Sequence, residues 1–283
     1  MINLHCGDAL AILKQLPDGA ADLIVADPPY GTTKLAWDQG LDWSALWPEL
    51  HRVTRPTATI LLFAAPGRCA ADLLNSNREA FRYELTWMKT RATGFLDANC
   101  RPLRVRESIL LFCRRWRGKG NRLAATFHPQ KTPGTPYLKQ RTGDRRGNRQ
   151  IHYGSSTDPF RPTLNASGER FPQDVLRFPS GNNGAHPTAK PVDLLRWLLR
   201  SYSNPGEVVL DFCMGSGTTG EACALENRRF IGIERNDIFF TQAADRLAML
   251  ALENRSPSVC IKAAELSVTE NDQRTFNYSV NDH

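Results

Sequence analysis

The sequence lacks the cysteine patterns of a metal site. Seven cysteines occur in 283 residues, with no Cys-x-x-Cys pair and no grouping with histidine that looks like a ligand set. They lie at Cys6, Cys69, Cys100, Cys113, Cys213, Cys223 and Cys260. This spacing argues against a bound metal, and the thiols are expected to be reduced.

Long hydrophobic runs are also missing. No apolar stretch approaches membrane-spanning length, and no signal peptide is recognisable. These absences predict a cytoplasmic protein without membrane contact. A chain of 283 residues can bury one large α/β core, so we expect one main domain with an insertion.

Acidic residues are scarce in one part of the chain. The whole chain has 36 Lys and Arg against 29 Asp and Glu, a formal net charge of +7. Residues 101–150 contain fourteen cations and only two acids, Glu107 and Asp144, so the remainder is net acidic. A solvated basic loop would give the same count, but contact with nucleic-acid phosphates is the interpretation we favour. The candidate contacts are Arg114, Arg115, Arg117, Arg141, Arg145, Arg146 and Arg149.

A four-residue motif, Asp27-Pro28-Pro29-Tyr30, follows directly after an apolar run. Residues 22–26 read as a buried strand, so Asp27 falls at its carboxyl end, where open α/β sheets bind ligands. Asp27 Oδ and the Pro28 carbonyl could accept both N–H groups of an exocyclic amine, while Tyr30 stacks on the base. A proline-rich turn capped by aspartate is the structural alternative.

A second motif is a glycine-rich loop between two strands. Residues 207–212 form the first strand, Gly215-Ser216-Gly217-Thr218-Thr219-Gly220 the loop, and residues 229–234 the next strand. This spacing fits a βαβ unit that binds a nucleoside, with Glu234 accepting hydrogen bonds from ribose hydroxyls. The three glycines also match the dinucleotide fingerprint, so an NAD-type oxidoreductase has to be considered.

Asp211, at the end of the first of these strands, argues against a dinucleotide. Its carboxylate would repel a pyrophosphate held at the N-terminus of the following helix. S-adenosylmethionine carries an ammonium and a sulfonium but no phosphate. The same acid therefore suits that cofactor.

Together these motifs resemble the amino-methyltransferases of DNA. The resemblance rests on three motifs in order, which are Asp27-Pro28-Pro29-Tyr30, His186-Pro187-Thr188-Ala189-Lys190-Pro191 and Asp211-Phe212-Cys213-Met214-Gly215-Ser216-Gly217. A catalytic motif first and a cofactor loop last resembles the β group of that family, and Gly7-Asp8-Ala9-Leu10 resembles its opening. The similarity spans residues 3–115 and 180–250.

The resemblance implies a role for each matching residue. The target base would be handled by Asp27, Pro28, Pro29 and Tyr30. The cofactor would be held by Asp8, His186, Thr188, Lys190, Asp211, Phe212, Gly215, Gly217, Thr218 and Glu234. Asp8 would lie near the adenine of the cofactor, and Lys190 would be available for its carboxylate. Aspartate rather than serine at the first catalytic position resembles the adenine-directed members.

We therefore expect an α/β fold of the Rossmann-like, S-adenosylmethionine-dependent methyltransferase type, with a mostly parallel sheet flanked by helices. The methyltransferase domain is expected at 1–115 and 181–255, an inserted basic target-recognition region at 116–180, and a polar tail at 256–283. Hydrophobic patterns predict helices at 10–16, 43–53, 68–75, 190–202 and 236–250. They also predict strands at 58–63, 81–88 and 108–113, the last two as antiparallel neighbours at the sheet edge.

The expected activity is methyl transfer from S-adenosylmethionine to the N6 amine of adenine in a specific DNA sequence, by base flipping and direct attack. No Pro-Cys dipeptide occurs, so the covalent cysteine route used at cytosine C5 lacks its usual residue pair. Cytosine N4 methylation, an RNA substrate and a non-catalytic DNA-binding module remain alternatives beside the oxidoreductase. Double-stranded DNA is the expected partner, and a homodimer or a cognate restriction endonuclease would also fit.

Overall fold

The computed structural model describes residues 1–30, 40–117, 124–139, 163–180, 189–253 and 261–263. The chain divides into two compact units, one of residues 1–128 and 174–283 and one of residues 129–173. In the described ranges, no helix is long and apolar enough to cross a membrane.

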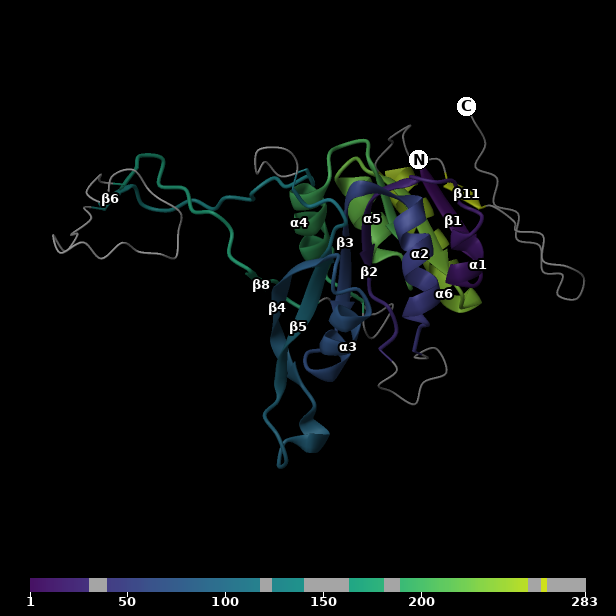
Figure 1. Cartoon of the computed structure of the whole chain (residues 1–283), viewed down its shortest axis with the longest axis horizontal. Coiled ribbons are helices and arrows are strands. Elements are labelled where there is room, and N and C mark those ends of the chain that lie inside the picture. Colours follow the sequence, from purple (N-terminus) through teal and green to yellow (C-terminus); the bar gives the residue numbers. More distant parts are fainter. Residues whose placement is uncertain (31–39, 118–123, 140–162, 181–188, 254–260, 264–283) are drawn as a thin grey trace, which may run out of the picture. The chain divides into compact units, whose positions relative to one another are not determined.

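The first unit is built around a twisted sheet (Figure 1). Its strands are β1 (Ile2–Cys6), β2 (Ala21–Ala26), β3 (Thr54–Ala64), β4 (Phe81–Thr93), β5 (Arg104–Phe112), β8 (Val175–Arg177), β9 (Val208–Asp211), β10 (Arg229–Glu234) and β11 (Ile261–Ala263). Within the described residues they follow the order β11-β1-β10-β9-β2-β3-β5-β4-β8. Neighbours from β11 to β3 are parallel, whereas β5 is antiparallel to both β3 and β4. β8 runs parallel to β4.

Helices cover both faces of this sheet (Figure 1). They are α1 (Ala9–Leu13), α2 (Trp43–Val53), α3 (Arg68–Ser76), α4 (Val192–Tyr202), α5 (Thr218–Leu225) and α6 (Asp237–Glu253). Successive strand side chains point to opposite faces. On β2, Leu23 and Val25 therefore belong to the core formed with α4, α5 and α6, and Ile24 and Ala26 to the core formed with α1, α2 and α3. A strand buried on both faces reads as a continuous apolar run, which is why the sequence identifies it.

The order of the strands creates a switch point between β2 and β9. These two strands are neighbours, with Leu23 opposite Val209 and Ile24 opposite Leu210. The chain continues from β2 to β3 in one direction and from β9 to β10 in the other. In open α/β sheets, ligands bind in the crevice at the carboxyl ends of such strands. Asp27 and Asp211 lie at these two ends.

The predicted α/β fold with a mostly parallel sheet is confirmed, but three strands are longer than predicted. β3 begins at Thr54, four residues before the predicted 58–63. β4 and β5 extend to Thr93 and back to Arg104, beyond the predicted 81–88 and 108–113, because they pair with each other past the end of β3. β1 was not predicted, since the polar residues Asn3 and His5 interrupt its apolar pattern. β1 is identified as a strand by its parallel pairing with β10.

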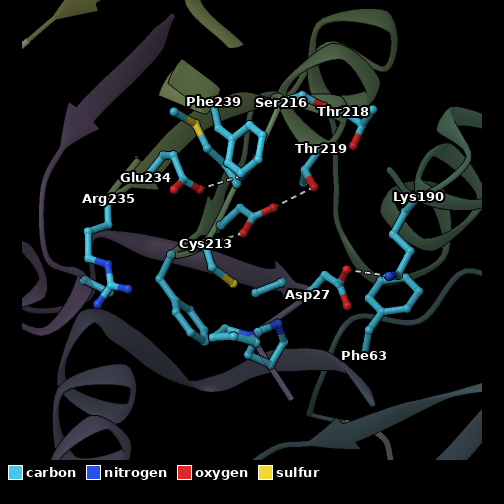
Figure 2. A pocket seen from close by; sticks show the side chains of 18 of the residues that line it. Asp27, Phe63, Lys190, Cys213, Ser216, Thr218, Thr219, Glu234, Arg235 and Phe239 are labelled. Atoms are coloured by element: carbon cyan, nitrogen blue, oxygen red, sulfur yellow. Dashed lines mark hydrogen bonds and ion pairs between the residues drawn. The ribbon is translucent and has the colours of Figure 1, made fainter. Parts of the chain in front are cut away.

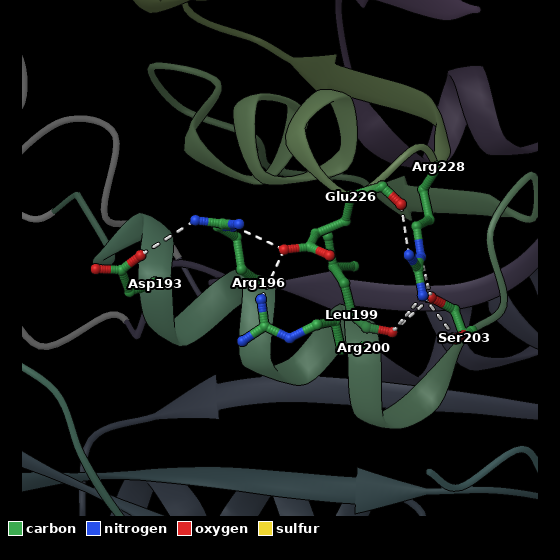
Figure 3. Close-up of polar contacts among 7 residues, drawn as sticks. All are labelled: Asp193, Arg196, Leu199, Arg200, Ser203, Glu226 and Arg228. Atoms are coloured by element: carbon green, nitrogen blue, oxygen red, sulfur yellow. Dashed lines mark hydrogen bonds and ion pairs between the residues drawn. The ribbon is translucent and has the colours of Figure 1, made fainter. Parts of the chain in front are cut away.

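The helix that follows Lys190 is fixed by a polar cluster at its far end (Figure 3). The buried guanidinium of Arg228 donates to the hydroxyl and the carbonyl of Ser203, at 3.1 and 2.9 Å. Glu226 accepts hydrogen bonds of 2.7 Å from both Arg196 and Arg200 on α4. These bonds satisfy carbonyls at the C-terminus of α4 and tie it to the end of α5. The start of α4, where Lys190 enters the site, is thereby held in place.

The second unit contains a short antiparallel pair, β6 (Tyr137–Lys139) and β7 (Thr163–Asn165). Lys131 forms an ion pair of 3.0 Å with Glu169. The Arg170 guanidinium lies 4.8 Å from the centre of the Tyr137 ring. The compact unit at 129–173 is shorter than the expected insertion at 116–180, and the target-recognition role of that region stays a prediction.

Candidate active site

A pocket of about 490 Å³ lies at the carboxyl ends of the parallel strands (Figure 2). The loops that follow four of these strands line it, at residues 7–9, 27–30, 212–216 and 235–236. Phe63 of β3, Glu107 of β5 and Lys190 complete one side. The pocket therefore contains both predicted motifs, which are far apart in the sequence and adjacent in the sheet.

Asp27 is the centre of one half of the pocket. The hydroxyl of Tyr30 donates to Asp27 Oδ1 at 2.5 Å, and the ammonium of Lys190 donates to Asp27 Oδ2. Burial raises the pKa of Tyr30 well above its usual value, and the negative charge of Asp27 adds to the shift. Tyr30 is therefore a neutral hydrogen-bond donor that orients the Asp27 carboxylate.

Lys190 is a buried cation between two acids. Its ammonium contacts Asp27, lies 3.3 Å from Glu107 Oε2, and sits 5.1 Å from the centre of the Phe63 ring. Burial alone would lower the pKa of Lys190, but the charges of Asp27 and Glu107 outweigh it and raise that pKa. Only 7% of this residue is exposed, so its charge is compensated inside the protein rather than by water.

Glu107 was not predicted as a site residue. Its carboxylate forms ion pairs with Lys190 and Lys89. Burial acts to raise the pKa of Glu107, but these two ammonium groups outweigh burial and lower it. The sequence does contain one signal for a special role, because Glu107 is one of only two acids between residues 101 and 150.

Asp211 is the centre of the other half of the pocket. It is buried, with 3% exposure, and accepts hydrogen bonds from Thr219 Oγ1 at 2.7 Å and from the backbone N–H of Cys213 at 3.1 Å. Burial raises its pKa to about 7, and the nearby charges of Asp27 and Glu234 act in the same direction. Asp211 has no cationic partner among the described residues, in contrast to Asp27.

The glycine loop has two kinds of glycine. Gly215 has φ of +53° and no atom within 4 Å of where a Cβ would lie, so it opens the loop toward the pocket. A Cβ on Gly217 would lie 2.9 Å from the Cβ of Ala243, and one on Gly220 would lie 2.9 Å from Phe230. These two positions therefore serve close packing of α5 against β10 and α6.

Glu234 holds the same loop through its carboxylate. Its Oε2 accepts a hydrogen bond of 2.9 Å from the N–H of Gly215, and its Oε1 accepts one of 2.8 Å from the N–H of Asn236. Asp8 accepts from the N–H of Ala11 at 3.0 Å and caps α1. Both acids line the pocket, and each oxygen retains capacity for a further donor.

The remaining predicted cofactor residues fall into two groups. Phe212 and Thr218 line the pocket, and Phe212 is almost fully buried beneath it. His186 and Thr188 lie outside the described residues. Other pocket residues that the sequence did not single out are Leu41, Phe63, Arg235, Asn236 and Phe239. Within the described ranges, no group of three His, Cys, Asp or Glu side chains could hold a metal ion.

The predicted basic contacts that the structure describes do not line the pocket. Arg114 donates to the backbone carbonyls of His51 and Thr54, at 2.5 and 2.8 Å, and so joins β5 to the end of α2. Arg115 and Arg117 are exposed. The other four predicted contacts lie outside the described residues, and they are Arg141, Arg145, Arg146 and Arg149. Their contact with DNA stays a prediction.

Comparison with known proteins gives consistent results. The family model N6_N4_Mtase, described as DNA methylase, matches residues 21–245. The chain is 28% identical over 266 residues to the DNA adenine methyltransferase YhdJ of Escherichia coli (strain K12), covering 85% of this chain and 81% of that protein. It is 30% identical over 263 residues to the type II methyltransferase M.HpaI of Haemophilus parainfluenzae, covering 87% and 74%.

Solved structures resemble the fold. The complex of M1.HpyAVI with S-adenosylmethionine matches with a TM-score of 0.56 and 23% identity, covering 87% of this chain and 99% of that one. The cytosine-N4-specific PvuII DNA methyltransferase matches with a TM-score of 0.58 and 14% identity, covering 86% and 85%. The fold is therefore shared with a protein that is named as specific for cytosine N4.

Proposed function

Because this chain belongs to the N6_N4_Mtase family of DNA methylases, we propose that it methylates the N6 amine of adenine in double-stranded DNA. The cofactor is S-adenosylmethionine, which supplies an electrophilic methyl group on a positively charged sulfur. One observation carries the proposal. Asp27 and Asp211 line the same pocket from neighbouring strands, and Asp27 pairs with the ammonium of Lys190 whereas Asp211 has no cationic partner among the described residues.

The half of the pocket around Asp211 fits the cofactor. A buried carboxylate whose pKa is raised to about 7 gains most from a ligand that brings positive charge. Gly215 leaves open space beside it, and Glu234 at the end of β10 is placed to accept from ribose hydroxyls. Asp8 lines the same pocket for the adenine end. A dinucleotide is disfavoured here because its pyrophosphate would face the carboxylate of Asp211.

The half around Asp27 fits a flipped base. Asp27 Oδ1 and the Pro28 carbonyl would accept the two N–H groups of the exocyclic amine, with the base amine taking over the position of the Tyr30 hydroxyl. The amine nitrogen is a poor nucleophile because its lone pair is delocalised into the ring, and these bonds localise it. The ring of Tyr30 would stack on the base. Once the methyl group is on the nitrogen, the Asp27 carboxylate receives the proton that the amine releases.

Adenine rather than cytosine is supported by the first residue of the catalytic motif. Aspartate at position 27 resembles the adenine-directed members of the family, and one relative is named a DNA adenine methyltransferase. Cytosine N4 is the alternative, because the family covers both amines and the PvuII enzyme shares the fold.

The test is to methylate genomic DNA with labelled cofactor and to identify the product nucleoside and its positions by sequencing. We expect N6-methyladenine at a defined sequence. Asp27→Ala should abolish transfer while the affinity for S-adenosylmethionine, measured by calorimetry, stays near that of the wild type. N4-methylcytosine would overturn the assignment of the base. A wild-type protein that binds DNA and cofactor but methylates no duplex would overturn the activity.

A further inference from the structure

The hairpin formed by β4 and β5 extends beyond the sheet at the edge that carries the pocket. β3 pairs with β5 only from Ile60 opposite Phe112 to Ala64 opposite Ser108. Ala64 is the last residue of β3, so residues 89–106 continue past the carboxyl end of that strand (Figure 1). Glu107, which lines the pocket, is the residue at the base of this extension.

The tip of the hairpin exposes large apolar side chains. Phe95 and Leu96, in a short 3₁₀ turn, are 68% and 103% exposed. Single exposed apolar residues are ordinary, but two adjacent ones at the end of a projecting hairpin form a continuous apolar surface. Gly94 enters the turn with φ of +93°, a left-handed conformation that favours glycine.

The chain on either side of the tip is strongly basic. Residues 89–106 contain Lys89, four arginines and one acid, which is a net charge of +4. The four arginines are Arg91, Arg101, Arg104 and Arg106. Arg101 pairs with Asp97, and Arg106 lies 3.8 Å from Glu84. The four side chains of these two ion pairs are between 39% and 51% exposed. Exposed pairs of this kind contribute little free energy and can exchange for phosphate contacts.

We propose that the β4–β5 hairpin is a DNA-binding arm, in which Phe95 and Leu96 insert into the duplex beside the flipped base and the arginines below them contact phosphates. The inference rests on the proposed function, since it takes DNA as the substrate. Apolar side chains flanked by cations are the chemistry with which proteins wedge open base steps. A second copy of the chain is a poorer fit, because each copy carries a net charge of +7.

The wedge should act on base flipping. Flipping leaves a gap in the base stack, and an apolar side chain that enters it offsets part of the unstacking cost. The hairpin starts next to the pocket, so its tip reaches DNA close to the base that enters the pocket. The four arginines of the hairpin, called the basic stalk below, should act on the affinity for DNA. This effect is separate from base flipping, and it is recognised by its dependence on salt concentration.

The test uses the full chain and a duplex of about 30 base pairs that contains the methylated sequence. In the double variant Phe95→Ser/Leu96→Ser we expect kcat on this duplex to fall at least tenfold, with the affinity for S-adenosylmethionine unchanged. A mismatch at the target base should restore most of the loss, because an unpaired base is easier to flip. Leu252→Ser on α6, where the side chain is 75% exposed, is the matched control and should behave as the wild type.

The basic stalk is tested by salt titration of binding to the same duplex. Arg101→Gln/Arg104→Gln should reduce the slope of log K against log salt by about 1.8, because each lost phosphate contact removes about 0.9. Arg229→Gln is the control and should leave the slope unchanged, because Arg229 lies at the amino end of β10, away from the strand ends that carry the pocket. The slope is measured without methyl transfer, so it reports the phosphate contacts of the hairpin even if the proposed reaction does not occur.

Two outcomes would overturn the proposal. One is wild-type kcat, affinity and salt slope in all the hairpin variants. The other is a dimer of the wild type that the Phe95→Ser/Leu96→Ser variant loses while its affinity for DNA is retained, which would assign the tip to a subunit interface. Light scattering on both proteins distinguishes this case.

Discussion

We expect S-adenosylmethionine to bind more tightly as the pH rises from 6 to 7.5, with Asp211 as the cause. Burial raises the pKa of Asp211 to about 7, so the carboxyl is largely protonated at pH 6. A positive group beside it favours the ionised form and lowers this pKa. Binding therefore releases a proton at low pH, and removing protons from solution favours binding.

The size of the effect follows from the same pKa. About one-tenth of Asp211 is ionised at pH 6 and about three-quarters at pH 7.5 when the pKa is about 7. If Asp211 is ionised in the complex at both pH values, the dissociation constant falls about eightfold, or about 1.2 kcal/mol. The range stops at pH 7.5 because the α-amino group of the cofactor itself begins to lose its proton near pH 7.7–8.0.

Calorimetry in two buffers with different heats of ionisation measures both the affinity and the proton release. At pH 6 we expect release of about 0.9 proton per cofactor bound, decreasing to about 0.2 at pH 7.5. The control is Asp211→Asn, which has no titrating group there and should bind weakly with a flat pH dependence. If the variant shows the same pH dependence as the wild type, another group is responsible and the reasoning is refuted.

The same pKa makes a prediction for stability. An acid whose pKa is higher in the folded state binds more protons when folded, so stability decreases as the pH rises from about 4 through 7. A shift from 3.8 to about 7 corresponds to a loss on the order of 4 kcal/mol. The free energy of unfolding of Asp211→Asn minus that of the wild type should therefore be larger at pH 8 than at pH 4. Urea unfolding at the two pH values measures this difference, and an equal difference at both would contradict the assignment.

Substitutions at three further positions test the rest of the pocket. Glu107→Gln leaves Lys190 with one carboxylate fewer and should lower the free energy of unfolding by about 3–5 kcal/mol at pH 7. Because the pKa of Glu107 is lowered by folding, this deficit should shrink as the pH falls below the ordinary pKa of glutamate, about 4.3, and should be lost as the pH falls through the lowered pKa of the folded state, which urea titrations measure. Tyr30→Ala should weaken base engagement by about 1–3 kcal/mol, whereas Tyr30→Phe should be milder because the ring survives; KM for DNA reports both. Glu234→Ala should weaken cofactor binding by about 1.5–3 kcal/mol in calorimetry, and unchanged affinity would remove the ribose assignment.

The positions of the acids at the sheet edge could be predicted from the sequence. Asp27, Asp211 and Glu234 each end an apolar run, and the carboxyl ends of parallel strands meet at one edge. The sequence does not reveal that β9 is the neighbour of β2. That adjacency depends on pairing between strands separated by most of the chain, and it is what brings the two motifs into one pocket.

The environment of Lys190 could not be predicted. The resemblance implied contact with the carboxylate of the cofactor, and that assignment stays a prediction. In the structure, its ammonium contacts Asp27 and Glu107. Glu107 reaches it because β5 runs antiparallel to β3, with Ser108 opposite Ala64 at the pocket edge. No periodicity along the sequence encodes which face of β5 meets a lysine more than 80 residues away.

The charge of Asp211 shows why motif and environment must be read together. The motif alone implies a fixed negative charge at this residue, but burial raises its pKa to about 7, so the charge depends on pH and on what is bound. Asp27, on the neighbouring strand, has its cation built in as Lys190. The negative charge of Asp27 also raises the pKa of Asp211, so ionising Asp211 places two negative charges close together. A positively charged cofactor removes that conflict by supplying the counter-ion that Asp211 lacks. The cofactor should therefore bind as part of the electrostatic structure of the site, and its binding should shift Asp211 fully to the ionised form.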